Sequence, residues 1–94
     1  MPTHKCILAI VQSIPPGQVT TYGWIADRLD GATARTVGHA LKTDGHHVPW
    51  WRVVDATGRP APGAERIARA HYQDEGTPLK THVDGTYSVD MASF

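Results

Sequence analysis

The residues most able to form a binding site are two adjacent tryptophans in the segment Pro49-Trp50-Trp51-Arg52-Val53. Two neighbouring indoles rarely both fit the core of a small domain, and exposing them to water is costly. If the segment is extended, their side chains point to opposite sides, so that one packs inward while the other lines a surface or a pocket. Arg52 places a cation close to the rings, and proteins hold unpaired nucleobases with aromatic rings near cations. The segment predicts a base-binding site, and the alternative is a core tryptophan with an incidental neighbour.

The other reactive side chains form no comparable pattern. The chain has six histidines, but His46 and His47 are adjacent in an expected loop and no cysteine pair accompanies them, so we expect no metal and no cofactor. The single cysteine, Cys6, falls at or beside the buried face of the first expected helix, which predicts an inert core thiol. No nucleophile elbow and no glycine-rich phosphate loop is present. A lone cysteine cannot form an internal disulfide, and this favours a reducing, cytoplasmic location.

Length and composition predict one globular domain over residues 1–94, with 40% hydrophobic and 19% charged residues. No apolar run approaches the roughly 18 residues that cross a bilayer, so we expect no membrane partner, and we expect a monomer. The formal net charge is zero, but residues 31–72 carry six cations against three acids, and residues 73–94 carry one cation against four acids. This asymmetry fits a one-sided nucleic-acid surface, although an ordinary solvated surface accounts for it equally well.

Hydrophobic periodicity and capping residues predict four helices and little β structure. The first helix buries a face from Ile7 to Ile14 and ends at Pro15-Pro16-Gly17. The other helices are expected from Tyr22 to about Leu29 after Thr20 or Thr21, from about Ala34 to Lys42 after Thr33, and from Ala64 to Glu75 before Gly76. Their expected inward residues are Ala34, Val37, Leu41, Ile67, Ala68 and Tyr72. A short strand is expected at Val53-Val54 and a hairpin at Asp84-Gly85.

The second and third helices have the proportions of a helix-turn-helix, because about four residues separate them. The outer face of the third helix presents Arg35, His39 and Lys42 at positions i, i+4 and i+7. Any pair of packed helices in a bundle could share this spacing, and the basic stripe leaves both interpretations open. The expected fold class is mainly α with minor β, in one small domain with a winged helix-turn-helix-like DNA-binding core.

Over about residues 4–76 the chain resembles the C-terminal, DNA-binding domain of the O6-alkylguanine-DNA alkyltransferases. The matching segments, in family order, are Ile14-Pro15-Pro16-Gly17, Thr21-Tyr22-Gly23, Ile25-Ala26, Arg35-Thr36-Val37-Gly38, Ala40-Leu41 and Glu75-Gly76. Those enzymes carry Pro-Cys-His-Arg-Val, and the cysteine takes the alkyl group from the damaged base. Here Trp50 stands at the cysteine position and Trp51 at the histidine position. Replacement of the cysteine by tryptophan is typical of the alkyltransferase-like proteins, and the chain is similar to these.

The resemblance implies a role for each matching residue. Tyr22 corresponds to the tyrosine that crowds the phosphate beside the target nucleotide and helps to rotate it out of the helix. Arg35 corresponds to the arginine finger that enters from the minor groove and fills the vacated space. The expected DNA-facing residues beside them are Thr21, Ala34, Gly38 and Lys42, and the expected lesion-pocket residues are Trp50, Arg52, Val53 and Arg59.

The departures from the family pattern also carry expectations. Glu75 remains from a charge relay that has lost its histidine and its thiol, so we expect it to be a structural hydrogen-bond acceptor. Asp44 stands where an asparagine would brace the active-site turn. Residues 59–63 predict a reshaped and stiffer pocket wall, because two prolines lie among them.

Indole has no ionisable nucleophile near neutral pH, so it cannot be a covalent acceptor. Extruding a base costs a few kcal/mol, and less when alkylation of guanine O6 has already weakened its pairing. One good aromatic contact returns about 1–3 kcal/mol. We therefore expect a non-enzymatic sensor that binds O6-alkylguanine in duplex DNA by flipping the base into a tryptophan-lined pocket. The resemblance implies that the complex is handed over to nucleotide excision repair proteins. In a bacterium, the DNA-bound protein would be associated with the nucleoid. The alternatives are a repair enzyme with residual alkyl transfer or base excision, and a helix-turn-helix regulator.

Overall fold

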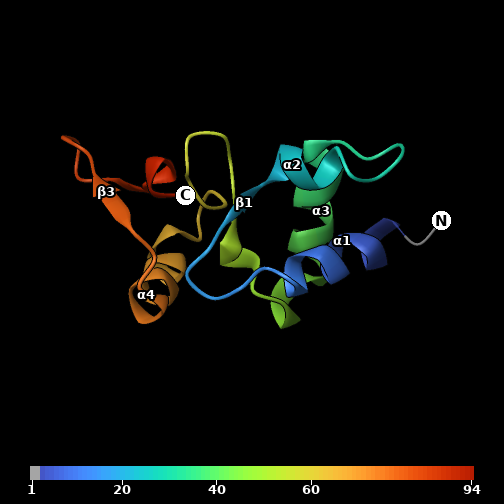
Figure 1. Cartoon of the computed structure of the whole chain (residues 1–94), viewed down its shortest axis with the longest axis horizontal. Coiled ribbons are helices and arrows are strands. Elements are labelled where there is room, and N and C mark those ends of the chain that lie inside the picture. The colour runs from blue at the N-terminus through green and yellow to red at the C-terminus, as the bar shows by residue number, and fades with distance from the viewer. Residues whose placement is uncertain (1–2) are drawn as a thin grey trace.

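A computed structural model describes the backbone of residues 3–94 and the side chains from residue 4 onward (Figure 1). The elements in chain order are α1 (Thr3–Gln12), β1 (Thr20–Thr21), α2 (Tyr22–Ala26), α3 (Ala34–Asp44), β2 (Val53–Val54), α4 (Glu65–Glu75), β3 (Leu79–Thr81) and β4 (Tyr87–Val89). Short 3₁₀ turns lie at Gly45–His47, Trp50–Arg52 and Met91–Ser93. The expected class, mainly α with minor β, is confirmed. Within the described part of the chain, no helix is long and apolar enough to cross a membrane.

The molecule is elongated, 42 × 24 × 21 Å, because its hydrophobic residues form two separate clusters. Figure 1 shows α1, α2 and α3 gathered at one end and α4 with the β3–β4 hairpin at the other, with β1 running between them. The first cluster is made of Ile7, Val11, Ile25, Ala26, Val37, Ala40 and Val53. The second is made of Val54, Ala68, Tyr72, Tyr87 and Val89.

Two threonines start the helices of the helix-turn-helix unit. The Thr21 side chain accepts a hydrogen bond from the Trp24 N–H and caps α2. Thr33 and Thr36 form a reciprocal capping box at the start of α3. The helix α2 is shorter than expected and ends at Ala26, because the Arg28 and Leu29 N–H groups bond to carbonyls three residues back and tighten the chain into turns.

The expected inward faces need two corrections, at Ala34 and at Ile67. In α3, Val37 is buried and Leu41 is half-buried against the first cluster, as expected, but Ala34 is exposed. In α4, Ala68 and Tyr72 are buried four residues apart, while Ile67 is 60% exposed because it lies about 100° around the helix from Ala68. Gly76 ends α4 in the left-handed conformation, as expected, with φ of 73°.

A parallel two-stranded sheet joins the two ends of the molecule. Thr20 pairs with Val53 and Thr21 pairs with Val54. Only Arg52 separates the tryptophan pair from β2, and Tyr22 follows β1 directly, so these distant segments lie side by side. The tryptophan segment is not extended as considered from sequence, because Trp50–Arg52 form a 3₁₀ turn.

The C-terminal hairpin is also confirmed. Strands β3 and β4 pair antiparallel, with Leu79 opposite Val89. Gly85 occupies the turn with φ of 88°, a value that favours glycine. The hairpin packs on α4 through Tyr87, whose ring lies edge-on to Tyr72 at 6.2 Å between centroids.

Candidate functional site

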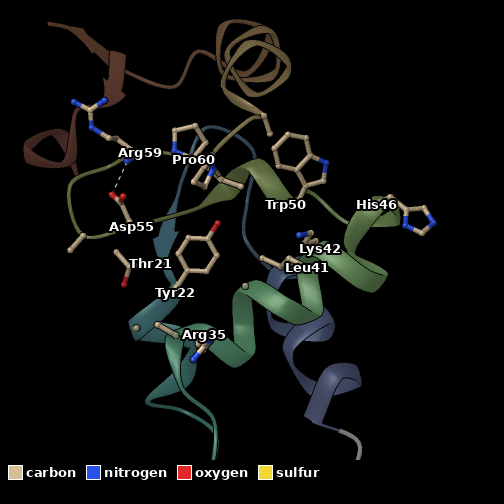
Figure 2. A pocket seen from close by; sticks show the side chains of 17 residues that line it. Thr21, Tyr22, Arg35, Leu41, Lys42, His46, Trp50, Asp55, Arg59 and Pro60 are labelled. Carbon is tan, nitrogen blue, oxygen red and sulfur yellow. Dashed lines mark hydrogen bonds between the residues drawn. The ribbon is translucent and has the colours of Figure 1, made fainter. Parts of the chain in front are cut away.

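A cavity of about 990 Å³ opens between α2, α3 and the loop of residues 55–63, with Trp50 in its wall (Figure 2). Cavities of this size accept small organic groups. Eight of the ten residues expected at the site line it, and these are Thr21, Tyr22, Ala34, Arg35, Gly38, Lys42, Trp50 and Arg59. The exposure of Ala34, which contradicted its expected burial, is explained by this position on the cavity wall.

Tyr22 stands in the middle of the cavity, and its hydroxyl points into the open space (Figure 2). A Cβ atom on Gly38 would lie 4.0 Å from the Tyr22 ring, so the glycine leaves room directly beside the tyrosine. Burial, and then the negative charge of Asp55, raise the pKa of Tyr22 above its ordinary value of 10.0. The hydroxyl therefore stays neutral and able to donate a hydrogen bond near neutral pH.

The charges on the cavity wall are mainly positive. Arg35 and Lys42 are exposed on α3, and Arg59 belongs to the loop, whereas Asp55 is the one carboxylate among the residues that line the cavity. Three cations against one anion favour a polyanionic ligand that covers the cavity mouth.

Arg52 and Val53, two of the expected pocket residues, do not line this cavity. The 3₁₀ turn directs the Arg52 guanidinium to Glu75, with 2.6 Å between Nη2 and Oε2 and 3.1 Å between Nε and Oε1. A third bond runs 2.8 Å from Arg52 Nη1 to the carbonyl oxygen of Ile14. Val53 is fully buried in the first cluster. Both residues support the wall from behind.

Glu75 is the hydrogen-bond acceptor expected from sequence. Besides Arg52, it accepts bonds from the Gly17 N–H at 3.0 Å and from Trp51 Nε1 at 3.0 Å. Burial alone would raise the pKa of Glu75, but the hydrogen bonds from Arg52, Gly17 and Trp51 outweigh burial and hold that pKa below its ordinary value. The carboxylate therefore ties the chain after α1, the tryptophan turn and α4 together.

The two tryptophans have different surroundings. Trp50 lines the cavity, whereas Trp51 packs face to face on His71, with 3.6 Å between ring centroids and a 6° angle between planes. The Tyr72 hydroxyl donates to the Trp51 carbonyl oxygen. Trp51 is thus the packing residue of the pair, and Trp50 is the one that a ligand can reach.

The loop of residues 55–63 forms the remaining wall and is fastened at its start by Asp55 and at its middle by contacts with the hairpin. One Asp55 carboxylate oxygen accepts from the backbone N–H of Thr57 at 2.9 Å and of Arg59 at 3.0 Å. The Val89 N–H donates to the Gly58 carbonyl oxygen at 2.8 Å. Arg59 Nη1 donates to Thr86 Oγ1 at 3.3 Å, and in Figure 2 the guanidinium points away from Tyr22 and Trp50.

The wall expected at residues 59–63 contributes Pro60, Ala61 and Pro62, whereas Gly23, Leu41, His46, Asp55 and Ala56 were not anticipated from sequence. The turn chemistry of Asp55-Ala56-Thr57-Gly58 was a usable signal for Asp55, because aspartate accepts bonds from N–H groups just after it. His46 carried no such signal, and its place in the wall follows only from the turn after α3.

The residues around the cavity supply no thiol. The one cysteine, Cys6, is exposed on α1 and does not line the cavity, so its expected place in the core is corrected. Its neighbour Ile7 forms the buried stripe of α1 with Val11 instead. Asp44 does not brace the tryptophan turn, because its carboxylate pairs with His4 at 2.9 Å. Across residues 4–94, no group of three His, Cys, Asp or Glu side chains could hold a metal ion.

Comparisons with known proteins agree with this geometry. The sequence model of the family described as "6-O-methylguanine DNA methyltransferase, DNA binding domain" matches residues 2–77. The chain is 32% identical over 91 residues to alkyltransferase-like protein 1 of Schizosaccharomyces pombe, which covers 89% of this chain and 84% of that protein. It is 42% identical over 57 residues to a DNA base-flipping protein of Vibrio parahaemolyticus, and this match spans only 56% of each chain.

Solved structures are similar over the same elements. The S. pombe Atl1 structure in complex with damaged DNA containing O6-carboxymethylguanine superimposes with a TM-score of 0.85 and 28% identity, over 99% of this chain and 93% of that chain. The O6-methylguanine methyltransferase of Mycobacterium tuberculosis gives a TM-score of 0.65 and 30% identity, over 80% of this chain and 48% of the enzyme. The chain therefore belongs to the family of the 6-O-methylguanine DNA methyltransferase DNA-binding domain, and within that family it is an alkyltransferase-like protein.

Proposed function

We propose that this protein is a non-enzymatic DNA-damage sensor that binds O6-alkylguanine in duplex DNA and receives the flipped base in the Trp50 cavity. The observation that carries the proposal is the cavity itself, which brings Trp50, Tyr22 and Arg35 from three separate segments to one opening. The S. pombe relative, seen with damaged DNA containing O6-carboxymethylguanine, supports the class of ligand.

Each side chain at the opening has a task in this function. The neutral Tyr22 hydroxyl can approach a phosphate without charge repulsion and crowd the nucleotide out of the stack. Arg35 is exposed in the first turn of α3, where it can enter the duplex and fill the space that the base leaves. Lys42 lies about two turns further along the same side of α3 and can neutralise a neighbouring phosphate.

Lesion selectivity follows from the balance of two free energies. Flipping costs a few kcal/mol and costs less for a base whose pairing is already damaged. Contact with Trp50 returns about 1–3 kcal/mol for any base, because every base has a π-face. A normal guanine pays the full flipping cost, so an alkylated guanine is bound preferentially without any chemical step.

The complex with the flipped base is proposed to be the end point of the protein's action, with no alkyl transfer after binding. Cys6 is exposed on α1 and outside the cavity wall, so it is not placed to accept an alkyl group from a base held there. Binding without repair is useful when other proteins recognise the complex, and we propose that these are nucleotide excision repair proteins. We further propose that the protein acts as a monomer in the cytoplasm.

Titration of two duplexes that differ only at one O6-methylguanine tests the proposal. We expect tighter binding of the damaged duplex, with intact masses of protein and DNA unchanged after long incubation. Equal affinity for the two duplexes would refute the sensor function, and a mass gain on the protein or a changed base would establish an enzyme instead. Preference among undamaged sequences would identify a regulator.

Matched variants locate the site. Trp50→Ala is expected to reduce the affinity for the damaged duplex by roughly 5- to 150-fold, from the loss of about 1–3 kcal/mol of stacking. Trp24→Ala is the control, because Trp24 is 45% exposed on α2 but does not line the cavity. Arg35→Ala is expected to lose most affinity, with Arg28→Ala as its control. Similar effects of either variant and its control would contradict the assigned site.

A further inference from the structure

A second hollow, of about 480 Å³, lies on the other face of the 55–63 loop, between the start of α4 and the tip of the β3–β4 hairpin. Four loop residues line both the Trp50 cavity and this hollow, and these are Asp55, Arg59, Pro60 and Pro62. The loop is therefore a thin partition between two adjoining sites.

Three arginines line this hollow, which we name the arginine hollow. Arg59 comes from the loop, and Arg66 and Arg69 come from α4. The Arg59 guanidinium bonds to the neutral Thr86 hydroxyl at 3.3 Å, and the Arg69 guanidinium carbon lies 5.3 Å from the centre of the Tyr87 ring. In the part of the chain that the structure describes, none of the three forms an ion pair. The Arg59 charge helps to lower the pKa of the Asp55 and Asp84 carboxylates, so Arg59 is partly compensated, whereas Arg66 and Arg69 have no ion-pair partner among the described residues.

The two acidic residues of the arginine hollow are already engaged in holding the loop. Asp55 accepts bonds from the backbone of Thr57 and Arg59, and Glu65 accepts a bond from the Gly63 N–H at 2.8 Å. Together with Asp84, which accepts hydrogen bonds from Thr86 at the rim and interacts with Arg59, these carboxylates equal the three cations in number, so the hollow offers oriented guanidinium groups rather than a net positive charge. Guanidinium groups in such a setting match the planar, bidentate bonding of phosphate oxygens.

We propose that the arginine hollow binds backbone phosphates of the same duplex whose flipped base enters the Trp50 cavity. The proposal rests on the proposed function, because that function places a polyanion against the other face of the partition. Continuity with that face and the two α4 guanidinium groups, which form no ion pair with a described residue, favour DNA over an acidic peptide. The C-terminal hairpin, which begins beyond the residues that match the family model, thereby becomes part of the DNA interface through Thr86 and Tyr87.

The salt dependence of binding tests the proposal, because each phosphate contact contributes about 0.9 to the slope of log affinity against log salt concentration. The variant Arg66→Gln/Arg69→Gln removes two cations from the arginine hollow. The control Lys5→Gln/Lys80→Gln removes two exposed cations that do not line either site. We expect the slope to fall by about 1.8 in the first variant, equally on damaged and undamaged duplexes, and to change little in the control.

A second measurement separates a located contact from a general charge effect. Duplexes shortened on one side of the lesion are titrated with the wild type and the arginine variant. We expect the variant to lose affinity relative to the wild type only on duplexes that keep the flank reaching the arginine hollow. When that flank is removed, the difference between variant and wild type should disappear, and when the opposite flank is removed, it should persist. Arg66→Gln alone repeats the test without disturbing the Arg69–Tyr87 contact, in case the double variant is poorly folded.

An unchanged salt slope, or a loss that does not depend on either arm, overturns the proposal. Loss of binding to a polyglutamate peptide with an unchanged DNA slope also overturns it and assigns the hollow to an acidic protein partner. Failure of the proposed function looks different, because the wild type would then bind both duplexes equally while the slope difference on undamaged DNA remained.

Discussion

Replacing Glu75 with glutamine is expected to destabilise the protein by about 3 kcal/mol, the lower end of the cost of removing one partner of a buried ion pair, because this pair keeps some exposure to water. The Arg52 and Glu75 side chains are 13% and 11% exposed, and the carboxylate accepts four hydrogen bonds, two on each oxygen. Glutamine keeps one acceptor oxygen and replaces the other by a donor. In either orientation two of the four donors lose their acceptor, and one of these two belongs to Arg52.

Urea unfolding at neutral pH, followed by tryptophan fluorescence, measures this effect. The loss corresponds to a drop in melting temperature of roughly 12 °C or more, since a domain of this size shifts by about 4–8 °C per kcal/mol. Asp74→Asn is the control, because Asp74 is exposed in the same helix and its change is expected to stay within about 0.5 kcal/mol. In a double-mutant cycle with Arg52→Met, the coupling energy is expected to reach at least about 2 kcal/mol. A cost below about 1 kcal/mol for Glu75→Gln, with an unchanged urea dependence, would refute the role assigned to this carboxylate.

Three further outcomes are expected. The pKa of Glu75 in the folded protein lies below its ordinary value of 4.5. The carboxylate therefore stabilises the fold above pH 4.5, and this stabilisation is lost as the pH falls through the lowered pKa. Acid unfolding of Glu75→Gln should consequently show a weaker pH dependence than that of the wild type. Gly58→Ala should unfold at lower urea than Gly85→Ala, because both glycines have φ near 87–88° but only at Gly58 would the new Cβ lie 2.5 Å from a β4 carbonyl oxygen; equal midpoints would contradict the close packing of the loop on the hairpin. Trp50→Cys should not restore strong alkyl transfer, because its neighbour Trp51 donates to Glu75 and offers no base, and robust single-turnover transfer measured by protein mass would oppose this.

The helical part of the site could be predicted from the sequence because its signals are local. Thr21 and Thr33 mark the starts of α2 and α3, and the spacing of Arg35 and Lys42 on α3 places both on its exposed side. Helical periodicity defines a stripe but not its edges, and for this reason Cys6 and Ile67 were assigned to the core although neighbours take those places.

The part of the site that depends on distant contacts could not be predicted in the same way. Arg52 turns away from the cavity because its acceptors are Glu75, 23 residues later, and Ile14, 38 residues earlier. The position of Arg59 likewise depends on Thr86, which follows 27 residues later. No spacing rule along the chain encodes such pairings, and they decide which face of the loop each side chain occupies.

The parallel pairing of β1 with β2 fixes the width of the cavity. Tyr22 follows β1 directly and Trp50 lies three residues before β2, so moving one wall from the other requires breaking main-chain pairing at Thr20–Val53 and Thr21–Val54. The loop of residues 55–63 is instead fastened to the hairpin by one main-chain bond at Gly58 and one side-chain bond at Arg59. Larger adducts must therefore be accommodated by movement of the loop. Exchanging the loop (residues 55–63) together with the hairpin that holds it (residues 79–89) between relatives is expected to alter the range of accepted lesions. The helices that meet the duplex would stay unchanged.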